Sequence, residues 1–295
     1  MSIILKVLLR IILVVVIIAA LAVGAVWEFC YLKFKVNVFS VIGSINDLNK
    51  PVEIQTIAPK AIKDSDMEDA MTAANASIPN LITKDSEGNY TINDHALPLM
   101  ISNMVLTDKE VCSIINTLMK NDSNNISFNT GGSNINLKDY NFKLIQFDFS
   151  SLDTENKTVK FNTVASISLD KIKEKMSSFP LSIFKSRIPQ TLYISNTVTI
   201  KKLDEAFTYE VTSESLTANN LPQNKIDEMF TLLNAFVNIG TPQELGKTVG
   251  ENLVNAFIGN SSNEGFAYKL RDAGATDFNF VKDGENVNYV INKLI

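Results

Sequence analysis

The single histidine of the chain, His95, limits the catalytic chemistry that the sequence can carry. A Ser-His-Asp or Cys-His hydrolase would need this residue beside its nucleophile, and a zinc site would need three or four ligands. His95 lies in "NDHALP", with no cysteine close to it in the sequence. We interpret it as a loop residue and expect no catalytic site, no metal and no cofactor.

Four acidic side chains gather in "DSDMED", at Asp64, Asp66, Glu68 and Asp69. A calcium loop that begins at Asp64 would need Gly at its sixth position and Glu at its twelfth, where this chain has Asp69 and Asn75. Acidic residues are favourable at the positive end of a helix dipole. The cluster therefore predicts a solvated helix start, with opportunistic cation binding as the alternative.

The other candidates for chemistry do not form a recognisable site either. The glycines in "NDSNNISFNTGGSN" (121–134) lack the Lys and Ser/Thr of a phosphate loop, so they predict a turn. Cys30 and Cys112 are the only cysteines, too few for a disulfide framework. Cys30 follows "WEF", which lacks the small residues that precede a lipidated cysteine, and we expect Cys112 to be a small buried hydrophobe.

The N-terminal region predicts a membrane anchor. Residues 11–32 are almost entirely apolar, and about 20 such residues span a bilayer as a helix. Basic side chains flank both ends of the span, but long C-terminal domains translocate largely regardless of charge. We therefore expect residues 1–10 in the cytoplasm, a single-pass signal-anchor, and a domain outside the cytoplasm. The alternative is a cleaved signal peptide, for which "AVGA" (22–25) offers small residues.

The rest of the chain predicts a stalk or linker over 33–76 and an extracytoplasmic α+β domain over 77–295. Without disulfides, and rich in Asn, Lys and Ile, the chain fits a bacterial cell-envelope protein. Its formal charge of −5 and its lack of a basic, aromatic patch argue against a nucleic-acid partner.

Alternating apolar and polar residues predict long antiparallel strands with one solvent-exposed face. The segments "NFKLIQFDFS", "TVKFNTVASISL" and "LYISNTVTI" alternate in this way, and a last strand returns through Phe207, Tyr209 and Val211. Asn196 interrupts the apolar row of the third segment. Because buried amides need partners, Asn196 pairs internally, lies at the rim of the sheet, or faces something polar.

Amphipathic helices can cover the apolar face of this sheet. "TDKE" and "TPQE" are capping boxes that begin helices at Thr107 and Thr241, and an apolar stripe predicts another helix from Ile226 to Val237. The fold class expected is α+β: a transmembrane helix, followed by a long-stranded, curved antiparallel sheet that packs on amphipathic helices.

The motifs "LTDKEVCSIINTLM" and "SESLTANNLPQNKIDEMF", and the order of the elements, resemble the YpmS-like family of single-pass envelope proteins of Gram-positive bacteria. The resemblance covers about 105–260. It implies an outside domain like the tubular lipid-binding class, in which a curved sheet wraps a long helix. The residues that match the family have a structural role only, and they include Asn219, Asn220, Leu221 and Pro222.

Two functions follow as hypotheses, while an envelope enzyme is a weaker third. The first is a binding module that shelters a lipid or another apolar ligand between sheet and helix, since each buried methylene is worth about 0.8 kcal/mol. The second is a structural or interaction protein with a filled core and an envelope protein as partner. In the first hypothesis the ligand would be lined by Phe147, Phe149, Phe161, Leu192, Ile194, Asn196, Val198, Tyr209, Val211, Phe230 and Phe236.

Overall fold

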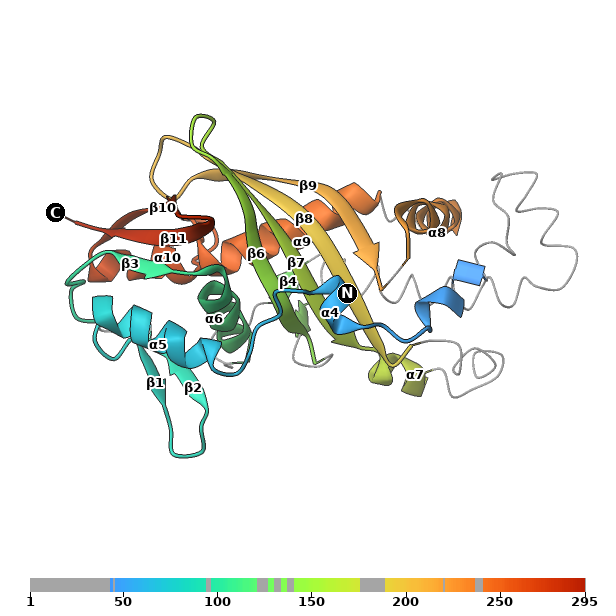
Figure 1. Cartoon of the computed structure of the whole chain (residues 1–295), viewed down its shortest axis with the longest axis horizontal. Helices are drawn as coiled ribbons and strands as arrows, with labels where there is room; N and C mark the ends of the chain where they lie inside the picture. Colours follow the sequence, from blue (N-terminus) through green and yellow to red (C-terminus); the bar gives the residue numbers. More distant parts are fainter. Residues whose placement is uncertain are drawn as a thin grey trace, which may run out of the picture.

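The computed structural model shows an α+β protein with curved antiparallel sheets and several helices (Figure 1). It describes residues 43–44, 46–93, 97–120, 127–129, 134–136, 141–175, 189–219, 221–236 and 241–294. The expected anchor at 11–32 and His95 lie outside these ranges. Inside them, no helix has both the length and the hydropathy that a membrane crossing requires.

Four long strands form the main sheet, and every neighbouring pair is antiparallel. Phe161 lies opposite Val198, and Ile200 lies opposite Val211, so apolar side chains share one face as their alternation predicts. The order along the sheet is β6 (Lys143–Asp153), β7 (Thr158–Ser168), β8 (Thr191–Lys202) and β9 (Tyr209–Ala218).

Two details of the predicted strands and loops are wrong. Phe207 does not belong to the returning strand, which begins at Tyr209; it lies in the β8–β9 turn with φ +55. Its backbone N–H donates to the Asp277 carboxylate at 3.0 Å, a long-range contact that the local pattern does not reveal. The predicted polar loop 121–134 contains a strand of the short β4 (Ser127–Asn129) and β5 (Asn134–Asn136) pair.

Helix α9 (Pro242–Phe257) runs along one face of the main sheet (Figure 1). Its predicted capping box is confirmed, with Thr241 accepting from the Glu244 N–H at 3.1 Å and Glu244 accepting in return at 2.7 Å. A Cβ atom on Gly250 would lie 2.8 Å from Cγ2 of Val198. The glycine therefore lets the helix backbone lie directly against β8.

A smaller sheet and two helices complete the core beside α9. The sheet has the order β10 (Ala275–Asp283), β11 (Asn286–Lys293) and β3 (Met104–Leu106). Helix α6 (Asp108–Lys120) follows β3 and begins at the predicted Thr107 capping box. A short antiparallel hairpin is formed by β1 (Ile82–Lys84) and β2 (Tyr90–Ile92).

The remaining described helices are short or lie at the ends of the domain. Helix α7 (Asp170–Lys175) follows β7, and α8 (Gln223–Phe236) lies beyond the end of β9 (Figure 1). Helix α10 (Phe266–Lys269) and the 3-10 helix η4 (Leu270–Ala273) follow α9 and lead into β10. They form the end of the molecule at which the chain terminates.

The folded domain begins before residue 77. Helix α5 (Asp66–Ser77), which lies within the expected stalk, buries Met67, Ala70 and Ala74 in the core. The chain before it, including α4 (Ile54–Ile57), crosses the outer face of the main sheet (Figure 1). Lys60 fastens this segment to β6, because its ammonium lies 2.6 Å from the Asp148 carboxylate.

Candidate functional site

Most of the residues expected to line a lipid are packed against the protein's own side chains. The rings of Phe147 and Phe161 stack with centroids 4.6 Å apart, and Phe257 of α9 meets Phe147 edge-on at 5.2 Å. Phe149, Leu192, Val198 and Val211 are buried, while Ile194 and Tyr209 are half-buried. The side chains of Phe230 and Phe236 lie outside the described part of the structure. Where it is described, the space between the sheet and α9 is occupied by the protein's own side chains.

Asn196 is satisfied within the protein. Its side-chain amide donates to the Gly246 carbonyl of α9 at 2.8 Å, and its Oδ1 accepts from the Ser213 hydroxyl at 2.8 Å. The residue is buried, so both bonds replace contacts with water. Of the three roles left open for Asn196, the structure shows internal pairing, which joins the sheet to α9.

The other candidates for chemistry are structural in the described residues. Cys112 is buried, and burial raises the pKa of its thiol well above the ordinary value, so it is a poor nucleophile. Asp66, Glu68 and Asp69 occupy the first turn of α5 as predicted. Within the described ranges, no three side chains of His, Cys, Asp or Glu come together as a metal site.

A cavity of about 560 Å³, which we call the polar groove, opens at the end of the molecule where the chain terminates. Five segments build it: the β8–β9 turn, the loop after α9, the α10–η4 helices, the start of β10, and Leu294 after β11. Two carboxylates, hydroxyls, an amide, an arginine and two aromatic residues line it together. The residues are Glu205, Ala206, Phe207, Thr208, Asn260, Ser261, Tyr268, Arg271, Asp272, Gly274, Ala275, Thr276 and Leu294.

Tyr268 and Arg271 give the polar groove an aromatic and cationic wall. The Arg271 guanidinium lies 4.6 Å from the centroid of the Tyr268 ring, and that ring meets Phe207 edge-on at 5.5 Å. Gly259 and Gly265 make the adjoining loop compact, because a Cβ on Gly265 would lie 2.8 Å from the Gly259 Cα. The Tyr268 and Arg271 wall is therefore positioned by the α10–η4 helices on one side and by Phe207 of the β8–β9 turn on the other.

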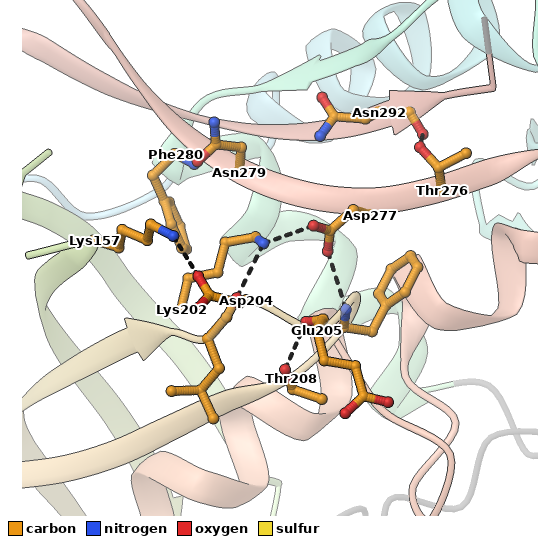
Figure 2. Close-up of polar contacts among 12 residues, drawn as sticks. Lys157, Lys202, Asp204, Glu205, Thr208, Thr276, Asp277, Asn279, Phe280 and Asn292 are labelled. Atoms are coloured by element: carbon orange, nitrogen blue, oxygen red, sulfur yellow. Dashed lines mark hydrogen bonds and ion pairs between the residues drawn. The ribbon is translucent and has the colours of Figure 1, made fainter.

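The ion pair of Lys202 and Asp277, drawn in Figure 2, lines a second cavity beside this groove. The Lys202 ammonium is 2.6 Å from Oδ2 of Asp277, and the two side chains are only 15% and 24% exposed. The Lys157–Asp204 pair nearby, also 2.6 Å long, is far more exposed. The second cavity, of about 320 Å³, extends along β10 and is called here the edge cavity.

Exposed apolar side chains border the polar groove. Leu99, Ile101 and Leu294 are 72%, 63% and 65% exposed, the highest fractions among large hydrophobic residues in the described chain. They lie together because the N–H groups of Met100 and Leu294 donate to the adjacent carbonyls of Ala273 and Gly274, at 2.8 and 2.9 Å. We call these three residues the apolar rim.

Sequence patterns did not identify the groove or the rim, since their residues come from four distant stretches of the chain. The one available signal was the apolar run "LPLMI" (97–101), which has neither strand nor helix periodicity. The arrangement can bind a polar and apolar surface by hydrogen bonding, ring contact and burial. No protein-family model, no curated protein and no solved structure matches this chain.

Proposed function

We propose that this protein is a membrane-anchored interaction protein of the bacterial cell envelope, which binds a partner protein at the polar groove and the apolar rim. The observation that carries the proposal is the gathering of Leu99, Ile101 and Leu294 beside a cavity with a Tyr–Arg wall. Clustered exposed apolar residues mark interaction surfaces, and Tyr and Arg are enriched among residues that dominate binding energy.

The filled space between the sheet and α9 favours this function over lipid sheltering. A lipid chain there would have to displace the stacked rings of Phe147 and Phe161, or separate Gly250 from Val198. Either change would sacrifice dispersion contacts that a close-packed core depends on. The apolar anchor at 11–32 and the resemblance to YpmS-like proteins support the envelope location.

The arrangement of the domain suits binding away from the anchor. The first described residues, near Leu48, lie at the α8 end of the molecule, and the apolar rim lies at the opposite end of its long axis (Figure 1). A chain that leaves the membrane before residue 43 would thus enter the domain at one end and present the rim at the other.

Site-specific photo-crosslinking in native membranes tests the proposal. A photoreactive amino acid would replace Leu99, Ile101 or Leu294 in the full chain, and Ile54 would serve as the control, since it is 41% exposed and lies on α4. We expect the three rim positions to capture the same protein and Ile54 to capture none. Adducts with lipid only, or no adducts from the rim, would refute the proposal.

Lipid analysis of the same full chain separates the two original hypotheses. The protein would be purified in detergent, and its organic extract would be examined by mass spectrometry before and after incubation with deuterated phospholipid. We expect no lipid at one molecule per chain after detergent exchange. A stoichiometric lipid that resists exchange would instead support the sheltering function.

A further inference from the structure

Strand β10 forms an open edge beside the polar groove. In the order β10-β11-β3 it is the outer strand, and no other strand of the described chain pairs with its free side. The two cavities lie along it in succession: the polar groove reaches Ala275 and Thr276, and the edge cavity reaches residues 277–280. An extended backbone could therefore lie beside β10.

The hydrogen-bond directions identify which backbone groups face this edge. At the end of β11, the Leu294 N–H donates to the carbonyl of Gly274, which precedes β10. The Lys293 N–H donates to the side-chain oxygen of Asn103, which precedes β3. Backbone direction alternates along a strand, so Val290 faces β10 and pairs with Asn279. The N–H and C=O groups of Phe278 and Phe280 consequently point to the open side, although their rings are buried in the core.

Asn279 occupies part of this edge. Its side-chain oxygen accepts from the N–H of Phe280 at 2.9 Å. A carbonyl from an incoming strand would take the same position on that N–H. Asn279 therefore competes with strand addition, in the way that side chains commonly protect exposed sheet edges.

The charged residues beside β10 indicate how a segment that binds along this strand is oriented. Lys157 and Lys202 line the edge cavity, but each ammonium lies 2.6 Å from a carboxylate, of Asp204 and Asp277 respectively, so the charges there balance. The polar groove has an acidic balance, with Glu205 and Asp272 against Arg271. A complementary segment carries a basic residue near the polar groove.

We propose that an extended segment of the partner adds to β10 as a further strand, with a basic residue at the polar groove. The inference rests on the proposed function and specifies its binding mode. Main-chain hydrogen bonds to Phe278 and Phe280 supply the affinity in such strand addition, and flanking cavities supply the specificity.

Peptide selection on the full chain in detergent tests this binding mode. A display library of random twelve-residue peptides would be selected on the immobilised protein, and the strongest peptide would be resynthesised with single backbone N-methyl groups. We expect tenfold or greater losses of affinity at alternate positions, and losses below twofold between them. Asn279→Ala should raise affinity roughly fivefold because it frees the Phe280 N–H from one ordinary hydrogen bond.

Asn288→Ala is the matched control, since Asn288 belongs to the same sheet but to the interior strand β11. We expect it to leave peptide affinity unchanged. An N-methyl scan without the alternation, equal effects of Asn279→Ala and Asn288→Ala, or a selection that yields no micromolar peptide would overturn the inference. If crosslinks from Leu99 still capture a protein in that case, the proposed function stands and strand addition alone fails; if they do not, both fail.

Discussion

Lys202 and Asp277 form an ion pair of 2.6 Å that joins the end of the main sheet to the start of β10. The other carboxylate oxygen of Asp277 accepts the N–H of Phe207 at 3.0 Å. The Asp277 side chain thus links the β8–β9 turn to the smaller sheet beside the two cavities. Phe207 has a positive φ, which bulky residues adopt only when their surroundings hold them there.

Removing the Asp277 carboxylate should destabilise the domain. We expect Asp277→Ala to lower the free energy of unfolding by about 1–3 kcal/mol, because it leaves a poorly hydrated ammonium and a free N–H. Asp277→Asn should cost less, since its oxygen can still accept from Phe207. The exposed control Asp204→Asn should change stability by less than about 0.5 kcal/mol. Urea unfolding measures all three, and equal values for the Asp277 and Asp204 variants would contradict the assignment.

Gly250→Ala should destabilise the protein although alanine is the better helix former by about 1 kcal/mol. The new methyl group would lie 2.8 and 2.9 Å from the two Cγ atoms of Val198, so helix and sheet must separate. We expect a net loss of about 1–3 kcal/mol, typical of overpacking. Val198→Ala should relieve part of it, so the double variant should be more stable than the sum of the single effects predicts in thermal unfolding.

Asn196→Leu should cost more than Ser213→Ala. The leucine removes the acceptor of the Ser213 hydroxyl and the second, side-chain donor to the Gly246 carbonyl where α9 lies close to the sheet, for an expected loss of about 2–4 kcal/mol. Ser213→Ala removes one donor and should cost about 1 kcal/mol. Chemical denaturation gives both values. A stable Asn196→Leu protein that has lost a bound lipid would instead support the alternative in which Asn196 faces a polar group of a ligand.

Asp108→Asn should stabilise the protein at neutral pH. Burial raises the pKa of the Asp108 carboxyl, and the neighbouring Asp148 carboxylate adds to the shift. The folded state therefore binds the proton more tightly than the unfolded state, and stability falls as the pH rises from the ordinary pKa through the raised one.

The effect of Asp108→Asn should thus vanish in acid. Below the ordinary aspartate pKa, near 3.9, both states are protonated, and we expect the variant and the parent to melt together. Melting temperatures across the pH range provide the measurement, and a variant that is less stable than the parent at neutral pH would contradict the prediction.

The sequence by itself determined the local structure of this protein. The capping boxes at Thr107 and Thr241 and the alternation through Ile200 appear in the structure. Their signals depend on hydrogen bonds and side-chain directions within a few residues, which a short stretch of sequence contains. The sequence also indicated that the apolar face of "LYISNTVTI" packs against the helices that begin near Gln223 and Pro242.

Only the tertiary structure decided what that face contacts and where the candidate site lies. Gly250 of α9 lies against Val198, and the Asn196 side chain donates to the Gly246 carbonyl. The backbone N–H of Phe207 donates to a carboxylate 70 residues further along the chain. The N–H groups of Met100 and Leu294 donate to the neighbouring carbonyls of Ala273 and Gly274. Contacts between such distant residues depend on the packing of every intervening element, so no local pattern contains them.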